Sequence, residues 1–174
     1  MSTNSQAFNP GHLPAKTKGS IVAHMTIEDF KLERFKIVFP DTEFPVVHAL
    51  PSEKCVDLKR KLAEKLGLAT NVAPVQLLET LYNSFHIERA GIVATDPGFN
   101  LGTLLRESGV KTSQQVYINW NQFDHVDEIK LTDLVKYFQY LWYPSSDDVE
   151  IFDDTLRWVA LVRHDGAVRV VRLE

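Results

Sequence analysis

The chain has 174 residues, of which 44% are hydrophobic and 24% are charged, and its formal net charge is −4. A chain of this length suits one domain, or one domain with an addition, and it can bury a core without disulfides or metals. A weak negative charge gives no general attraction to nucleic acid or to an anionic membrane, so neither is expected as a partner.

Three features of the chain favour a cytoplasmic location. The single cysteine, Cys55, excludes an internal disulfide and is typical of a reducing compartment. No apolar run approaches the roughly 18 residues that span a membrane. The first residues lack the charged-then-apolar pattern of a signal peptide. Residues 1–20 are rich in small and polar side chains, and we expect them to form a disordered N-terminal arm.

The segment 35–49 has the pattern of a tight β-hairpin. Apolar residues recur at every second position from Phe35 to Phe39, which predicts a strand with one buried face. The sequence Pro-Asp-Thr at 40–42 predicts a turn. The β-rich run at 44–49 would be the second strand.

A helix is predicted directly after this hairpin. Ser52 stands where an N-cap belongs, and Gly67 suits the residue after the helix. Apolar residues follow at spacings of three, four and four positions and would share one face: Cys55, Leu58, Leu62 and Leu66. On that face Cys55 is expected to behave as a small hydrophobic residue rather than as a nucleophile.

A hairpin, an amphipathic helix, a short helix at 101–109 capped by Asn100 and a strand at 116–120 resemble the element order of the ubiquitin-like β-grasp family. The resemblance implies an α+β fold with a β-grasp core over residues 21–123. Between these elements, residues 74–87 have helical periodicity, whereas a ubiquitin-like domain would place a strand nearby. We favour a helix there, followed by a short strand at 91–94.

Residues 124–174 are predicted to add a helix, an acidic loop and a β-hairpin packed on the core. The helix covers 131–142 and ends before Pro144. Asp165-Gly166 lies between two β-rich runs, which favours a two-residue type I′ turn with Val162 opposite Arg169. Both faces of this hairpin carry apolar residues, so either the sheet is covered on both sides or one face binds a partner.

The segment 122–155 contains nine acidic and two basic residues. Its most acidic part could be a cation site, but its spacing is not that of an EF-hand loop. It could be a solvated loop, or a patch that receives a basic protein. The residues predicted to contact such a partner are Tyr143, Asp147, Asp148, Glu150, Phe152, Asp153 and Asp154.

No phosphate-binding glycine motif occurs, and no catalytic residue, metal ligand or cofactor is predicted. The first functional hypothesis is a non-catalytic protein-interaction module, of which an immunity protein or antitoxin would be a special case. The alternative is a small enzyme or ligand-binding protein with a cleft between the core and the C-terminal unit. Asp147, Asp148 and His164 would lie at its edge. A pocket with a carboxyl group of shifted pKa would favour the alternative, and a flat acidic surface would favour the first hypothesis.

Overall fold

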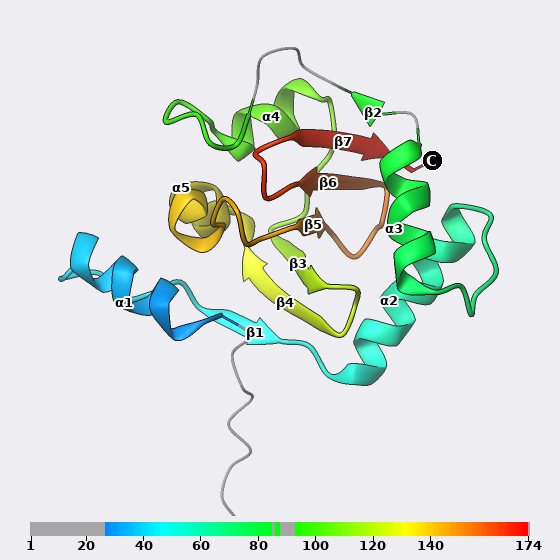
Figure 1. The fold of residues 1–174 in the computed structure, drawn as a ribbon, viewed down its shortest axis with the longest axis horizontal. Coiled ribbons are helices and arrows are strands. Elements are labelled where there is room, and N and C mark those ends of the chain that lie inside the picture. Colours follow the sequence, from blue (N-terminus) through cyan, green and yellow to red (C-terminus); the bar gives the residue numbers. More distant parts are fainter. Residues whose placement is uncertain (1–26, 85, 88–92, 174) are drawn as a thin grey trace, which may run out of the picture.

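A computed structural model describes residues 27–84, 86–87 and 93–173, and it combines helices with one antiparallel sheet (Figure 1). The predicted arm at 1–20 lies outside the described residues. The elements are, in order, α1 (Asp29–Val38), β1 (Val47–Ala49), α2 (Ser52–Lys65), α3 (Pro74–Asn83), β2 (His86–Ile87), α4 (Leu101–Glu107), β3 (Gln115–Asn121), β4 (His125–Lys130), α5 (Leu131–Leu141), β5 (Val149–Phe152), β6 (Trp158–Val162) and β7 (Val168–Arg172).

The seven described strands form a single sheet in the order β1-β4-β3-β5-β6-β7-β2. Every pair of neighbouring strands is antiparallel. Strands β3 to β7 come from residues 115–172 and fill the middle of the sheet, while β1 and β2 come from earlier in the chain and form its two edges. The fold is therefore α+β in the broad sense that was predicted.

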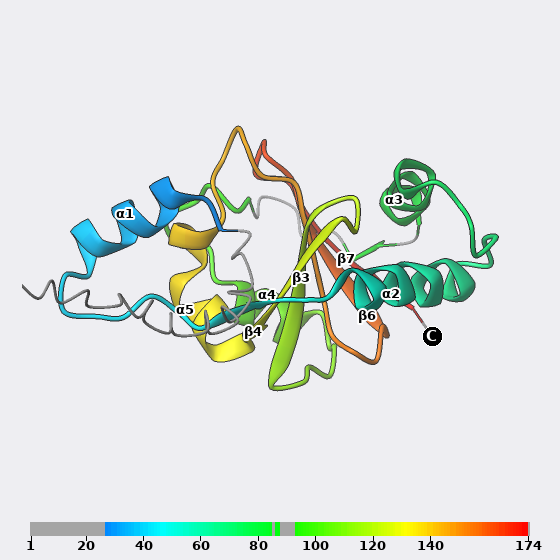
Figure 2. The ribbon, with the colours of Figure 1, turned by 90° about the horizontal axis from the view of Figure 1, so that it is seen from below.

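The sheet is covered on both faces. Helices α1, α4 and α5 lie on one side of it and α2 and α3 on the other (Figure 2). Strand β6 reflects this coverage on both faces, because all five of its residues are buried. Ala160 belongs to the core under α5, whereas Val159 and Leu161 belong to the core under α2 and α3. Alternate side chains thus enter two different cores. This double coverage explains why both faces of the predicted hairpin carry apolar residues, without a partner bound to one of them.

The predicted hairpin at 35–49 is wrong in its first half. Residues 35–38 belong to helix α1, whose buried side chains are Lys31 and Phe35. These two positions are four apart and therefore share one helix face, while Ile37 is 80% exposed. Only Val47–Ala49 forms a strand. The hairpin that opened the ubiquitin-like resemblance is not formed, and the β-grasp arrangement is not confirmed.

The later helices bury the faces that their apolar spacing predicted. Helix α2 buries Cys55, Leu58 and Leu62, as predicted, and Gly67 has a φ of 68°. The N-cap prediction was wrong, because Pro51 occupies that position and Ser52 is already helical.

Helix α3 starts at Pro74 and ends at Asn83, so the helical reading of 74–87 is confirmed for most of its length. Of the short strand expected at 91–94, only Val93 and Ala94 are described, and Val93 forms an isolated bridge with Ala167. In α4 the side chain of Asn100 accepts a hydrogen bond from the Thr103 amide, which confirms the predicted cap.

In the C-terminal part, α5 buries Leu134, Phe138 and Leu141 and ends before Pro144, as predicted. The hairpin after it has a different register. The amide of Gly166 donates to the Arg163 carbonyl oxygen, and Arg163 pairs with Ala167, so the loop has three residues rather than two. Gly166, with a φ of 89°, supplies the left-handed position of this loop type.

That extra loop residue moves every strand partner by one position. Val162 pairs with Val168, and Arg169 pairs with Leu161. The predicted pairing of Val162 with Arg169 is therefore wrong, because the register of a hairpin is set by the length of its loop.

Three strands were missed. Strand β2 lies at the end of the segment 74–87, which was predicted as a helix, and the other two lie in the segment that was expected to be linker and acidic loop. Strand β4 covers 125–130 and β5 covers 149–152, next to β3 on either side. The boundary drawn between residues 123 and 124 falls in the turn between β3 and β4, inside one sheet. Among the described helices, none has the length and apolar character needed to cross a membrane.

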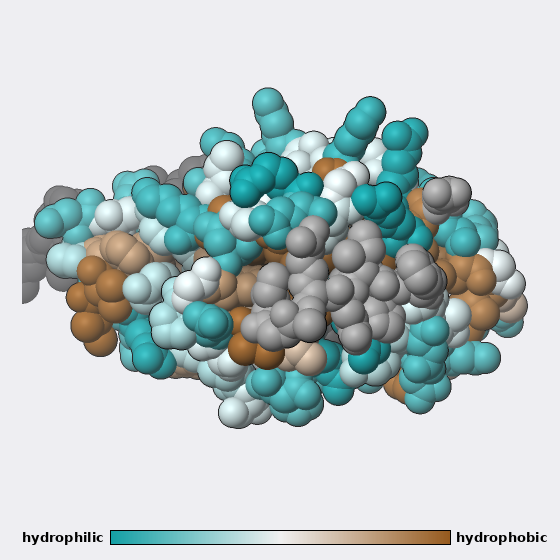
Figure 3. Space-filling view, turned by 90° about the horizontal axis from the view of Figure 1, so that it is seen from above, coloured by the Kyte–Doolittle hydropathy of each residue, from teal (hydrophilic) through white to brown (hydrophobic). Residues whose placement is uncertain are grey.

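The surface face seen in Figure 3 is mostly hydrophilic, with separate smaller areas of hydrophobic residues. The large apolar side chains that are most exposed include Ile37, Val46 and Val56. They come from three different segments, the end of α1, the approach to β1 and α2.

Candidate binding cleft between helix α3 and the sheet

The acidic loop predicted to face a partner does not form a continuous exposed surface. Asp147 and Glu150 are only 9% exposed, and Phe152 and Asp153 are fully buried. Tyr143 is partly buried, and only Asp148 and Asp154 are exposed. The surface is interrupted because part of the segment enters the middle of the sheet as β5, where side chains on both faces are covered.

Asp153 is a structural residue at the end of β5. Its carboxylate accepts hydrogen bonds from the backbone and hydroxyl of both Ser113 and Thr155, and from the Trp158 indole nitrogen at 3.0 Å. A buried carboxylate with this many donors is satisfied where it lies. It holds the β5–β6 turn against the segment before β3 and is not available to a ligand.

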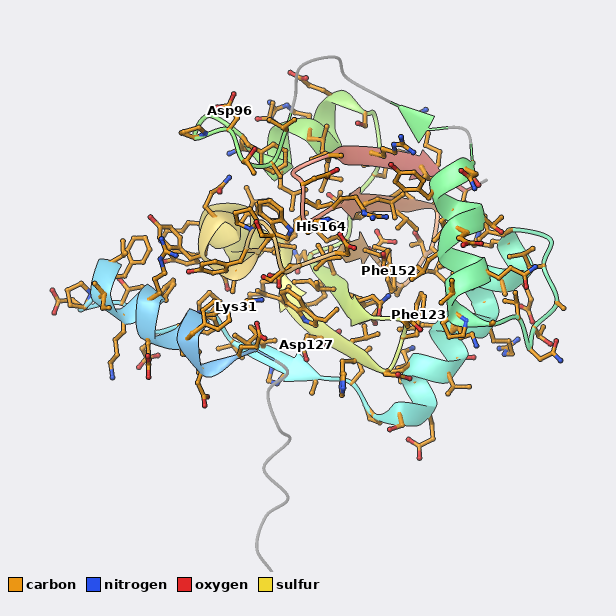
Figure 4. The ribbon with its side chains drawn as sticks, viewed as in Figure 1. Lys31, Asp96, Phe123, Asp127, Phe152 and His164 are labelled. Atoms are coloured by element: carbon orange, nitrogen blue, oxygen red, sulfur yellow. The ribbon has the colours of Figure 1, made fainter. Side chains whose placement is uncertain are left out.

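Asp147 has a similar role just before β5, in the layer that contains α1. It accepts hydrogen bonds from Lys31 Nζ at 2.7 Å, the Tyr143 amide at 2.8 Å and Ser146 Oγ at 2.9 Å. Lys31 is 2% exposed and its ammonium group lies 4.5 Å from the centre of the Trp120 ring. Lys31 reaches from α1 toward the sheet in Figure 4, so this ion pair fixes α1 to the start of β5.

A cleft of about 350 Å³ lies between α3 and strands β5 and β6, on the face of the sheet that α2 and α3 cover. Phe123 and Phe152, labelled in Figure 4, lie on this side of the sheet, with ring centroids 6.0 Å apart. The cleft is lined from α3 by Val75, Leu78, Glu79, Tyr82 and Asn83, and from the sheet and its turns by Gln122, Asp148, Glu150, Leu161 and Arg163.

Glu150 is the most perturbed group in this cleft. It lies in the central strand β5, and its Oε2 accepts a hydrogen bond from Asn119 Nδ2 at 2.5 Å. Burial raises the pKa of Glu150 to about 8, and the negative charge of Asp148 adds to the effect against the opposing hydrogen bond from Asn119. The carboxyl group is therefore largely protonated at neutral pH.

Asn119, which forms the hydrogen bond to Glu150, also bonds the turn that contributes Gln122 to the cleft. Asn119 Oδ1 accepts a hydrogen bond from the Phe123 amide at 2.8 Å. Gln122 and Phe123 have φ values of 48° and 68°, which is a left-handed conformation that side-chain-bearing residues seldom adopt. Such strain persists where surrounding contacts enforce it, and it is concentrated at functional sites. Here the Asn119 bond stabilises the turn that presents Gln122 to the cleft.

Asp148 forms the rim of the cleft together with two residues at the end of β6. Its Oδ1 lies 2.7 Å from the His164 amide, 2.9 Å from His164 Nδ1 and 3.1 Å from Arg163 Nε. Burial alone would raise the pKa of Asp148, but the hydrogen bonds from His164 and the charge of Arg163 outweigh it, so that the pKa is lowered. Asp148 is thus ionised at neutral pH, beside a protonated Glu150.

Tyr82 ties α3 to the sheet at the other side of the cleft. The Arg169 guanidinium carbon lies 3.8 Å from the ring centre and that of Arg163 lies 5.3 Å from it. Arg169 Nη1 also donates to the Tyr82 carbonyl oxygen at 3.0 Å. Cation–π contacts of this kind orient an arginine without neutralising it.

The alternative hypothesis located part of this site. Asp148 does line the cleft and His164 does lie beside it, but Asp147 faces the other layer with Lys31. The sequence argument missed Asn119, whose one available signal is a polar residue within the apolar strand at 116–120.

In the part of the chain that the structure describes, no group of three His, Cys, Asp or Glu residues is placed to hold a metal ion. No protein-family model, curated protein or solved structure matches the chain.

Proposed function

We propose that this chain is a non-catalytic protein-interaction module, and that its binding site is the cleft between α3 and the sheet. The observation that carries the proposal is the position of Glu150, a buried carboxyl group of shifted pKa that lines an open cleft. Groups of this kind occur preferentially at functional sites. No described contact within the fold requires an acid here, because the bond from Asn119 needs only an acceptor oxygen.

The charges around the cleft favour a basic partner. Three acidic residues line it, Glu79, Asp148 and Glu150, of which Glu150 is largely protonated at neutral pH, against one basic residue, Arg163. Complementary charge steers association and selects partners even where it adds little affinity. An immunity protein or antitoxin that occupies a basic toxin site would be one instance of such a module.

A second candidate function is a small acid–base enzyme. The contact of His164 Nδ1 with Asp148 at 2.9 Å favours it, since a carboxylate can orient an imidazole for proton transfer. Against it, the described residues that line the cleft include no Ser, Thr or Cys, and His164 itself is not among them. Binding without chemistry therefore accounts for more of the site.

The proposal is tested by charge reversal at Glu79, an exposed residue of α3 that lines the cleft. At low salt the wild type should bind an arginine–glycine repeat peptide and not a glutamate–glycine one, and Glu79→Lys should slow association about tenfold. The matched control is Glu33→Lys, which makes the same charge change on α1, in the layer on the opposite face of the sheet. Equal slowing by both variants, or no binding of the basic peptide, would contradict the proposal.

A further inference from the structure

We propose that the cleft binds one ammonium or guanidinium group of its partner directly against Glu150, and that Glu150 releases its proton to solvent as this cation binds. This inference rests on the proposed function and adds to it the chemical class of the bound group and a coupled proton. The reaction is a single ionisation, in which the O–H bond of the carboxylic acid breaks and the proton passes to the buffer.

The geometry of Glu150 leaves one of its oxygens for a ligand. The residue is nine-tenths buried, yet it lines the cleft. Oε2 is taken by the Asn119 amide. Among the side chains that the structure describes, none forms a hydrogen bond with Oε1. The backbone amide of Glu150 itself also contributes a hydrogen bond to the carboxyl group, so a cation at Oε1 would displace no described side chain of the fold.

The charged and titratable groups around Glu150 favour a cation over an anion. Asp148, just before β5, is compensated by Arg163 and His164, just after β6. Glu79 on α3 is exposed and forms no ion pair with another residue that the structure describes, so it leaves the cleft negative while Glu150 is neutral. The Arg169 guanidinium carbon lies 3.8 Å from the centre of the Tyr82 ring. An anion would be repelled by Glu79, whereas a cation would be attracted by it.

A bound cation would reverse the balance that keeps Glu150 protonated. Burial disfavours the carboxylate, and a positive charge within about 4–6 Å favours it. The two charges can therefore enter the cleft as a pair. The remaining polar atoms at the site, the side-chain amides of Gln122 and Asn83, are available to the other hydrogens of the guanidinium or ammonium group.

The size and walls of the cleft suit a basic side chain. A volume of about 350 Å³ lies at the lower end of the range for small-ligand pockets, about 300–1,000 Å³. Val75, Leu78 and Leu161 form its apolar wall. The methylene groups of lysine or arginine pack against such surfaces while the charged end reaches polar atoms.

The test is calorimetric titration with Nα-acetylarginine amide, alone and within the arginine–glycine peptide, at pH 7 in two buffers of different ionisation enthalpy. We expect about one proton released for each arginine group bound. Release should disappear above about pH 9, where Glu150 is already ionised. The neutral analogue Nα-acetylcitrulline amide should not bind.

Glu150→Gln keeps the shape of the side chain and the acceptor for Asn119, and it should bind the arginine probe at least about tenfold more weakly with no proton release. Binding of the basic peptide without proton release, and with equal affinity in the variant, would overturn this inference and leave the proposed function intact. Absence of any binding by the basic peptide would overturn both. The wild-type measurement is decisive even if the variant folds poorly.

Discussion

Because burial raises the pKa of Glu150 to about 8, from about 4.5 in an unfolded chain, the folded state holds more protons than the unfolded state between these two values. The free energy of unfolding must then fall as pH rises through this window and level off above it. Asp148 acts with the opposite sign, since its lowered pKa removes stability only as pH falls below the normal range of a carboxyl group.

Glu150→Gln should remove the first of these effects. In urea unfolding at pH 5 to 9, the wild type should lose up to about 1.4 kcal/mol for each pH unit within the window, which is the limit for one proton. The variant should show a flatter profile and should be the more stable protein at pH 8. Parallel profiles for the two proteins would show that Glu150 ionises normally.

Asp153 and Asp154 are adjacent acids that should differ sharply in their effect on stability. Asp153→Ala leaves the buried Trp158 indole and the polar groups of Ser113 and Thr155 without their acceptor, and should cost about 3 kcal/mol or more. Asp154 is exposed and accepts only a 3.4 Å contact from Ser113. Asp154→Ala is therefore the matched control and should change the free energy of unfolding by less than about 0.5 kcal/mol. Equal small effects would mean that Asp153 is solvated.

At the level of elements, the sequence predicted helices well where one apolar stripe decided them. Helices α2, α3 and α5 each bury a face with the expected spacing. Helix α1 was mistaken for a strand because its buried face includes a lysine, Lys31, while Ile37 and Val38 point outward. A charged residue in the core has no signature in periodicity, since the partner that compensates it is distant in the sequence.

The same reason explains why strands β4 and β5 were missed. The acidic residues of β4 and β5 led us to predict solvated loops for both segments. In the fold, Asp127 accepts a hydrogen bond from the Trp120 indole and Glu150 accepts one from Asn119. Both donors lie on β3, between the two strands. Burial of these acids depends on a strand order that local sequence does not determine.

The ion pair between Lys31 and Asp147 is expected to decide whether α1 stays in place. Lys31→Met leaves a buried carboxylate without its cation, which should cost about 3–5 kcal/mol, and amide hydrogens of α1 should exchange faster than those of α2. Lys36→Met removes a charge from the exposed face of the same helix and should leave exchange almost unchanged. Similar exchange in both variants would show that aromatic contacts such as Phe35 with Tyr137 are sufficient to hold α1.

For the whole molecule, the candidate site could be predicted only in part. The acidic segment did supply two cleft residues, Asp148 and Glu150, but as members of a single loop, whereas residues 149–152 form strand β5. The opposite wall comes from α3, about seventy residues earlier. Such a site is created by the order of strands in the sheet and by the layer on which each helix packs, and neither follows from composition or periodicity.

The order of the strands also constrains how the protein is made. The five central strands all come from residues 115–172. During synthesis, α1, α2 and α3 leave the ribosome before any of these strands exists, and side chains such as Leu62 and Leu77 have no sheet to pack against. The first half of the nascent chain cannot complete its packing until the second half arrives, and over that interval its apolar residues are exposed to chaperones and to aggregation.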